Sequence, residues 1–248
     1  MDSTSPKGMC LDSPHNDFSI PVPFLCEEDG LVTLCFETGS VQSQMRADAP
    51  DHLVLSYTRT MMDFLLCKRL PRRIDMIGLG GGSMAKWCYR HVPQADITVV
   101  EINPHVIGLR DRFRIPEDNH RFRVLCEDGA DYVARTSCHA DVLIVDGFNL
   151  DGQPPELCSQ RFYDDCHQAL TASGLMVVNL CGDDNQRILT RIRRSFGHRV
   201  LAVRPEVVGN TIVFASKGEP LWPTGESRDS FLMELRKPGS RQPFAKAS

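Results

Sequence analysis

The stretch RIDMIGLGGGSMAKWCYRHV, residues 73–92, decides the fold of this chain. An apolar run passes into a turn with four glycines, and a helix-like segment follows the turn directly. Because glycines lack side chains and a helix N-terminus offers free N–H groups, such a turn can bring a ligand close to the backbone. A tight strand-to-helix turn alone would need only one or two glycines. Gly78, Gly80, Gly81 and Gly82 therefore predict a ligand-binding loop.

The same alternation continues towards the C-terminus. Apolar runs are followed by helix-like segments four more times, at 96–102 and 104–113, 121–128 and 129–136, 140–148 and 159–171, and 174–181 and 183–196. Nearly continuous apolar strands that alternate with helices predict a parallel sheet covered on both faces. Two short runs, 198–205 and 211–218, are joined by a link with Gly209 and Asn210, which predicts a closing antiparallel hairpin. The predicted fold is α/β, a seven-stranded Rossmann-like sheet of methyltransferase type with five parallel strands and that hairpin.

The segments outside this pattern predict the domain organisation. Residues 1–16 are rich in Ser, Pro, Asp and Asn without periodicity and are expected to be disordered, and the tail 237–248 is expected to be loose. Short β-type runs between Gly30 and Leu55 predict a small N-terminal β appendage over 17–56. Residues 57–236 would then form the Rossmann-like nucleotide-binding catalytic domain, which begins with a helix before Pro71.

The composition narrows the class of protein. The 248 residues are 42% hydrophobic, enough for one large core with a small appendage. A formal net charge of −4 and scattered basic residues give no general attraction to phosphate backbones, so nucleic acid is not an expected partner. The segment MDSTSPKGMC, residues 1–10, lacks the apolar stretch of a signal peptide, and no run approaches the roughly 18 apolar residues of a membrane span. We therefore expect no membrane partner and a cytoplasmic location.

Ten cysteines are scattered along the sequence. They form no CxxC pair and no cluster with histidine at the spacing of zinc ligands, so no metal site is expected. Most of them lie in apolar runs, among them Cys35, Cys88, Cys126 and Cys181. We interpret the cysteines as small buried thiols in a reducing cytoplasm.

Acidic residues end three successive strands, and ligands of open parallel sheets bind beyond such ends. Glu101 follows the glycines by about twenty residues, where a carboxylate reaches ribose hydroxyls; a solvated acid at a helix start is the alternative. Asp128 can accept from an adenine amino group or cap the next helix, and the two roles are compatible. Asp146 ends a central apolar strand, where a buried carboxylate needs a partner; a structural acid is the alternative.

A nicotinamide enzyme must be weighed, because Gly80, Gly82 and Ala85 also fit a relaxed dinucleotide fingerprint. The closing hairpin, together with the further acids after the third and fourth strands, counts against it, since a dinucleotide domain has no need of that final pair of strands. We therefore expect an adenosyl-sulfonium nucleotide, S-adenosylmethionine or its decarboxylated form, in the domain from about Arg73 to about Lys217.

Over about residues 30 to 217, the sequence resembles the polyamine aminopropyltransferase family, that is, spermidine synthase and its relatives. Six elements match in order and spacing, namely Val41-Gln42-Ser43, Tyr57, Gly80-Gly81-Gly82, Val100-Glu101-Ile102, Glu127-Asp128-Gly129, and Asp146 with the later Phe162-Tyr163. The resemblance implies a transferase that uses decarboxylated S-adenosylmethionine or S-adenosylmethionine as co-substrate, without a metal, to alkylate a small-molecule amine. It also implies a homodimer.

The resemblance further implies roles for the matching residues. The glycine loop and Glu101 would hold the nucleoside, Asp128 would contact adenine, and Asp146 would bind the attacking amine and help to remove its proton. Gln42 and Tyr57 correspond to residues that line the nucleotide and amine pockets. The expected site comprises catalytic Asp146 and Tyr57; donor-binding Gln42, Gly78, Gly80, Gly81, Gly82, Ser83, Glu101, Ile102, Asp128 and Gly129; and amine-binding Asn149, Asp151 and Tyr163.

The chain departs from the family pattern at two positions. Ser83 stands where spermidine synthases carry an aspartate that pairs with the amino group of the aminopropyl arm, and Asn149 stands where they carry a second aspartate. Each change removes a negative charge that would neutralise a cationic substrate. Methyl transfer, transfer of the aminocarboxypropyl arm, and a non-catalytic nucleotide-binding homologue therefore stay open, and Asp151 is a candidate to replace the missing second acid.

Overall fold

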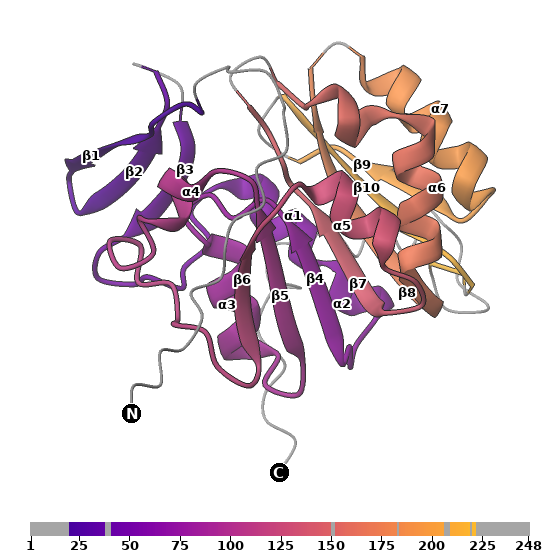
Figure 1. Cartoon of the computed structure of the whole chain (residues 1–248), viewed down its shortest axis with the longest axis horizontal. Coiled ribbons are helices and arrows are strands. Elements are labelled where there is room, and N and C mark those ends of the chain that lie inside the picture. The colour runs from indigo at the N-terminus through magenta and orange to yellow at the C-terminus, as the bar shows by residue number, and fades with distance from the viewer. Residues whose placement is uncertain are drawn as a thin grey trace, which may run out of the picture.

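The computed structural model describes residues 20–37, 41–149, 152–182, 184–205, 209–218 and 220–221. Its centre is a seven-stranded sheet with the strand order β6-β5-β4-β7-β8-β10-β9 (Figure 1). Five neighbouring strands are parallel, namely β6 (Phe122–Cys126), β5 (Asp96–Glu101), β4 (Arg73–Ile77), β7 (Ala140–Val145) and β8 (Leu170–Cys181). This arrangement confirms the predicted fold class.

A hairpin closes the sheet, as the two short C-terminal runs predict. Its strands are β9 (Val200–Val203) and β10 (Asn210–Ser216). β10 lies between β8 and β9 and is antiparallel to both, with Ile212 opposite Asn179 on one side and Val203 on the other. Because of this register, Asn210 comes to lie opposite Cys181, at the carboxyl end of β8.

Helices cover both faces of the sheet, because successive residues of a strand point to opposite sides. One core cluster contains buried residues of α5 (Gly129–Arg135), the 3-10 helix η1 (Pro155–Cys158), α6 (Gln160–Ala169) and α7 (Asn185–Phe196). The other contains buried residues of α1 (Ser56–Met62), α2 (Phe64–Cys67), α3 (Ser83–His91) and α4 (Pro104–Ile107). On β4, Ile74 and Met76 belong to the second cluster and Ile77 to the first.

The N-terminal β appendage is a separate three-stranded antiparallel sheet, β1 (Phe24–Glu28), β2 (Leu31–Cys35) and β3 (Val41–Arg46). Its buried Leu34 and Met45 belong to the same core cluster as α1 and α3, so the appendage packs on the larger sheet's helical layer. The sequence reading found the last two strands and missed β1. Four of its five residues are exposed, so it lacks the alternation that marks a half-buried strand.

Two expected helices are shorter in the structure. The helix expected over 104–113 ends at Ile107, and the chain continues in turns to Arg114, which has a φ of +52°. These turns bury Phe113 and Ile115 beneath the glycine loop, so packing overrides the local helical pattern. The helix expected before Pro71 is divided into α1 and α2 at Asp63.

The burial expected for the cysteines is only partly right. All nine cysteines in the described ranges are free thiols. Cys35 and Cys88 are buried, whereas Cys126 and Cys181 are exposed. Each of these two is the last residue of its strand, so an apolar run did not guarantee burial at that position.

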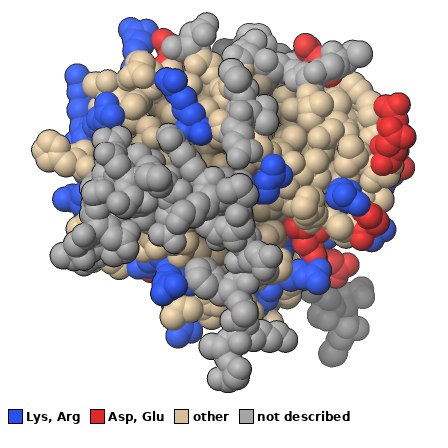
Figure 2. All heavy atoms as spheres, turned by 180° about the vertical axis from the view of Figure 1, so that it is seen from behind, with Lys and Arg blue, Asp and Glu red and all other residues tan. Residues whose placement is uncertain are grey.

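No helix in the described part of the chain is long and apolar enough to span a membrane. On the face shown in Figure 2, the lysine and arginine side chains form separate groups interrupted by other residues rather than one continuous stripe. The expectations for 1–16, for 237–248 and for Asp151 lie outside the described residues.

Candidate active site

The carboxyl ends of β4, β5 and β7 meet at one edge of the sheet, because these strands are adjacent and parallel (Figure 1). Beyond this edge, β4 runs into the glycine loop, β5 ends in Glu101 and β7 continues into Asp146. The Gly78 N–H donates to the Val100 carbonyl at 2.8 Å, and the Asp146 N–H donates to the Ile77 carbonyl at 2.9 Å. The expected donor loop and two of the expected acids therefore lie side by side.

Asp146 has a half-buried carboxylate that two side chains hold. The Tyr57 hydroxyl donates to Oδ2 at 3.0 Å, and Asn179 Nδ2 donates to Oδ1 at 2.9 Å. Burial raises the pKa of Asp146, while the two hydrogen bonds lower it. Both partners are neutral, so they orient the carboxylate without cancelling its charge. The negative charge of Asp146 is therefore available to a cation that binds at the carboxyl edge of the sheet.

Tyr57 reaches Asp146 from the first turn of α1, which packs against β8 and β10. Burial first, and then the negative charge of Asp146, raise the pKa of this phenol well above its usual value. Tyr57 therefore stays protonated and acts as a donor. The structure thus brings together the two residues that were expected to be catalytic.

Asn179 is a site residue that the sequence reading missed. Its side chain is only 2% exposed, and its Oδ1 accepts from Asn210 Nδ2 at 2.9 Å. Since the oxygen of the amide is occupied by Asn210, the nitrogen faces Asp146, and a line of hydrogen bonds joins β10, β8 and the end of β7. The available signal was a single polar residue in the otherwise apolar run GLMVVNLC.

Glu101 is nearly buried, with 9% of its surface exposed. Its Oε2 accepts from the Leu79 N–H at 2.9 Å, and its Oε1 accepts from the Asn103 N–H at 2.9 Å. Burial raises the pKa of Glu101, and these backbone donors lower it. The carboxylate ties the glycine loop to the start of α4, so the alternative of a solvated acid is wrong.

The protein's own packing requires several glycines of the loop. Gly78 has a φ of +95°, and a Cβ there would lie 2.3 Å from the backbone oxygen of Asp146. A Cβ on Gly81 would lie 2.7 Å from Ser43 Oγ and 2.8 Å from ring atoms of Phe113. Gly80 is less crowded, because the nearest atom is Ser43 Cβ at 3.6 Å. The number of glycines alone therefore did not distinguish a ligand loop from a tightly packed turn.

The β appendage reaches the glycine loop through β3. The Ser83 hydroxyl, at the start of α3, donates to the backbone oxygen of Gln44 at 3.4 Å. Gln44 Nε2 in turn donates to Thr33 Oγ1 at 3.3 Å. Gln42 is half-buried and lies two residues from Gln44, so both share one face of β3. This places Gln42 on the strand that borders the loop.

Asp128 caps the N-terminus of α5. Its Oδ1 accepts from the N–H groups of Ala130 at 2.7 Å and of Asp131 at 3.1 Å. Gly129 is needed there, because a Cβ would lie 2.3 Å from Ile77 Cγ2. Ile102, which follows Glu101, keeps 59% of its surface exposed. The capping role of Asp128 is therefore confirmed, and its contact with adenine stays a prediction.

Replacing Asp128 by Ala is expected to lower the free energy of unfolding by about 1 kcal/mol, because two backbone donors of α5 lose their acceptor. Urea denaturation would measure it. Asp128→Asn is the matched control, since Asn caps helices as well as Asp does and should retain the stability. Equal loss in both variants would show that the cap is not the reason.

The residues expected to bind the amine are only partly placed near Asp146. Asn149 lies three residues after Asp146 and is exposed, and its backbone forms a two-way bridge with Gly152. Tyr163 is fully buried in the core on α6, against Phe162, and its hydroxyl has no hydrogen-bond partner among the described residues. The core position of Tyr163 reflects the apolar face of its helix.

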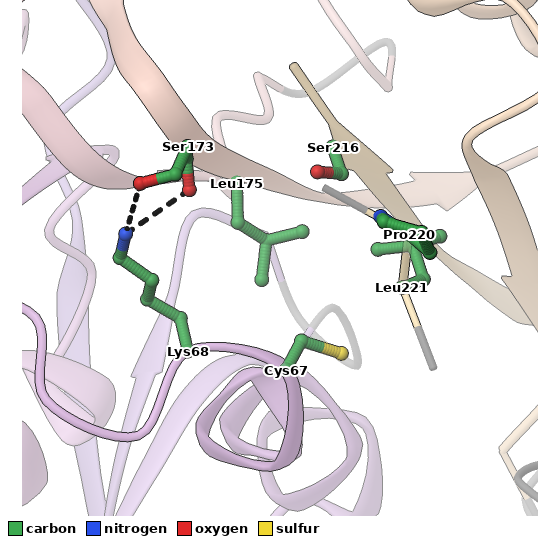
Figure 3. Close-up of a pocket in the computed structure, with 7 residues that line it drawn as sticks. All are labelled: Cys67, Lys68, Ser173, Leu175, Ser216, Pro220 and Leu221. Atoms are coloured by element: carbon green, nitrogen blue, oxygen red, sulfur yellow. Dashed lines mark hydrogen bonds between the residues drawn. The ribbon is translucent and has the colours of Figure 1, made fainter. Parts of the chain in front are cut away.

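A separate cavity of about 370 Å³ is shown in Figure 3. It is lined by Ser173 and Leu175, near the start of β8, so it lies at the opposite, amino-terminal edge of the parallel strands. There the Lys68 ammonium donates to the backbone oxygen and the hydroxyl of Ser173. The cavity is lined by Cys67, Lys68, Ser173, Leu175, Ser216, Pro220 and Leu221. None of the expected site residues that the structure describes lines it. Within the described ranges, no three His, Cys, Asp or Glu residues are grouped as metal ligands.

The sheet order and the closing hairpin define a fold class, the α/β proteins with a methyltransferase-type sheet. Solved structures share this fold. A probable spermidine synthase from Corynebacterium glutamicum has a TM-score of 0.71 and 21% identity, and the match covers 86% of this chain and 82% of that chain. Human methyltransferase-like protein 13 in complex with SAH has a TM-score of 0.63 and 24% identity, and the match covers 74% of this chain and 94% of that chain. A spermidine synthase in complex with the transition state analogue AdoDATO has a TM-score of 0.62 and 20% identity, and the match covers 79% of this chain and 74% of that chain.

Within this class, the chain belongs to the spermine/spermidine synthase family, whose domain model matches residues 54–211. A protein of Neisseria meningitidis serogroup A named polyamine aminopropyltransferase is 38% identical over 200 residues, which are 79% of this chain and 76% of that protein. One with the same name from Chromobacterium violaceum is 36% identical over 205 residues, 82% of this chain and 78% of that protein. The chain is therefore a transferase, as the resemblance implied.

Proposed function

We propose that this protein transfers an aminopropyl group from decarboxylated S-adenosylmethionine to a small amine, with Asp146 as the group that binds the amine and accepts its proton. Membership of the spermine/spermidine synthase family supports the reaction class. The assignment of Asp146 rests on one observation. Its carboxylate lies at the carboxyl edge of the central strands, and its two side-chain partners, Tyr57 and Asn179, are both neutral.

The charge of Asp146 fits an amine acceptor. A carboxylate that is partly removed from water gains most from a cation that supplies both charge and hydrogen bonds. An ammonium group provides both. Because burial raises the pKa of Asp146, the carboxylate is also a better proton acceptor than an ordinary aspartate.

The reaction needs only one displacement. The bound ammonium first loses one proton to solvent. The neutral amine nitrogen then attacks the methylene carbon next to the sulfonium and forms a C–N bond, while the C–S bond breaks and its electron pair stays on sulfur. The rest of the donor, without its aminopropyl group, leaves as neutral methylthioadenosine. The nitrogen loses one proton to Asp146, and the sulfonium charge is discharged in the same step. Tyr57 and Asn179 hold the carboxylate in line during this transfer.

The donor would lie along the same edge. Glu101 and the glycine loop would hold the ribose, Ile102 and Asp128 would border adenine, and Gln42 would approach from β3. Exposed Ile102 offers an apolar surface of the kind a purine ring requires. The homodimer that the resemblance implied is part of this proposal and is testable by analytical ultracentrifugation.

The product distinguishes the candidate reactions. Purified protein incubated with decarboxylated S-adenosylmethionine and putrescine should release methylthioadenosine, measured by chromatography. Omitting the amine is the control, since solvolysis of the donor would give the same thioether. If no amine accelerates its release, the proposal is wrong.

Methyl transfer is the second candidate. Ser83 favours it, because its neutral hydroxyl faces the backbone of Gln44 and brings no acid to the start of α3, so it repels the carboxylate of intact S-adenosylmethionine less than an aspartate would. Release of S-adenosylhomocysteine from S-adenosylmethionine would support it. Binding of either thioether without any turnover would instead indicate a non-catalytic homologue.

Replacing Tyr57 by Phe is expected to lower kcat by about tenfold or more, because one of the two hydrogen bonds that orient Asp146 is lost. That bond lowers the pKa of Asp146, so its loss should raise this pKa further. The acidic limb of the pH–rate profile should then shift to higher pH. Steady-state kinetics across pH would measure both effects.

Tyr89→Phe is the matched control for this prediction. The Tyr89 hydroxyl accepts from Asn119 Nδ2 at 3.4 Å, and its ring packs edge-on against Phe122 of β6. This variant should keep the wild-type profile. An unshifted acidic limb in Tyr57→Phe would contradict the assignment of that limb to Asp146.

A further inference from the structure

Lys86 is a buried cation close to the glycine loop. It lies on α3, which begins directly after the loop, and only 2% of its surface is exposed. Its Nζ donates to the backbone oxygen of Phe113 at 2.7 Å and lies 5.9 Å from the centre of that ring. No carboxylate forms a salt bridge with Lys86 in the described part of the chain.

The group that Lys86 holds lies directly against the loop. Phe113 is fully buried, and a Cβ added to Gly81 would be 2.8 Å from its Cδ1 and Cε1 atoms. Ile115, two residues further, is even closer to Gly82, since a Cβ added to Gly82 would lie 2.5 Å from Ile115 Cγ1. The segment with Phe113 and Ile115 therefore packs directly against two of the loop glycines, Gly81 and Gly82.

Lys86 is hydrogen-bonded both to the glycine loop and to the segment with Phe113 and Ile115. Its own backbone N–H donates to the Gly82 carbonyl at 2.9 Å, and its side chain reaches the Phe113 carbonyl. Lys86 therefore connects the glycine loop to Phe113 through two hydrogen bonds, and Phe113 in turn packs against the loop. A shift of Phe113 would move or release Gly81, because the contact leaves no free space between them.

We propose that Lys86 is a positioning residue, which fixes Phe113 against Gly81 and thereby holds the loop backbone in the conformation that receives the donor nucleoside. The proposal rests on the proposed function, because it assigns the glycine loop to the donor. It goes beyond that function by giving a role to a side chain that does not reach the reacting atoms.

The energetics of a buried lysine support a positioning role over a purely stabilising one. Burial lowers the pKa of Lys86 to about 8, with Asp51 raising it and Arg114 lowering it. The ammonium is thus less favourable inside the protein than in water. A methionine of similar length would remove that cost, although the Phe113 carbonyl would lose its donor. These two effects oppose each other, so the charge contributes little net stability.

Calorimetric titration with methylthioadenosine tests the role. This thioether is uncharged, so its own charge does not change between pH 7 and 9. The Lys86→Met variant should bind it about tenfold more weakly at pH 7, the size expected for losing a hydrogen bond from a charged donor. Its midpoint of urea denaturation should stay close to that of the wild type. Wild-type affinity should fall as the pH rises through 8, while the affinity of the variant should not change.

Lys68→Met is the matched control, since it makes the same change at the opposite edge of the sheet, where Lys68 contacts Ser173. It should bind methylthioadenosine like the wild type at each pH. Wild-type affinity in Lys86→Met would overturn the role of Lys86. If Lys86→Met does not fold, Lys86→Gln, which keeps a polar amide on a shorter side chain, takes its place, and wild-type affinity in that variant would overturn the role equally. Absence of wild-type binding would overturn the proposed function as well.

Discussion

Replacing Asp146 by Asn is expected to lower kcat for amine alkylation by about 10²- to 10⁴-fold, the range that a positioned proton acceptor contributes. The substitution keeps the shape of the side chain and removes its charge. Both hydrogen-bonding partners can be kept, because the new amide oxygen can accept from Asn179 and the new amide nitrogen can donate to the Tyr57 hydroxyl. The loss therefore isolates the charge. Steady-state kinetics with saturating donor and amine would measure it.

Stability provides the control for Asp146→Asn. The folded protein raises the pKa of Asp146, so the protonated form is favoured on folding. The stability that this group contributes is present at low pH and is lost as the pH rises through its folded pKa. At neutral pH the variant should therefore be at least as stable as the wild type, and the difference should vanish in acid. Methylthioadenosine affinity should be unchanged. Full activity in this variant would exclude Asp146 as the base.

The fold could be predicted from the sequence where burial is continuous. The strands β4, β5 and β7 are buried along nearly their whole length, because both faces of a central parallel strand are covered, and each carries consecutive apolar residues. The prediction failed where a segment is shaped by distant contacts. β1 is exposed and carries no periodic signal, and α4 stops at Ile107 because the chain turns to place Phe113 under the loop.

Some residues of the candidate site could likewise be predicted from the sequence, and others could not. Glu101 and Asp146 could be found because they follow strand ends, and parallel strands bring those ends to one edge. Asn179 could not be found, since its importance depends on the register of β10 against β8, which brings Asn210 within reach. The sequence also could not tell that Phe113 and Ser43 lie against Gly81, because these residues are far apart along the chain.

Replacing Gly78 by Ala is expected to produce the largest loss of stability, about 3 kcal/mol or more, together with a loss of activity. A side chain at a φ of +95° is strained, which costs about 1–2 kcal/mol. Overpacking adds about 1–3 kcal/mol, because the new Cβ would lie 2.3 Å from the Asp146 carbonyl oxygen. That oxygen belongs to a strand end tied to Ile77 and cannot move alone. Urea denaturation and kinetics would measure the two losses.

Gly197→Ala separates the two causes, because Gly197 also has a positive φ, +67°, but no atom lies within 4 Å of an added Cβ. It ends α7, away from the carboxyl-edge acids, so it should lose only the stability due to backbone strain and keep full activity. The excess loss in Gly78→Ala then measures the contact with Asp146. Since the same displacement moves the carboxylate that is proposed to accept the proton, kcat should fall in Gly78→Ala even under conditions where the variant is fully folded. A folded Gly78→Ala enzyme with wild-type kcat would mean that the reaction does not depend on where the end of β7 places Asp146.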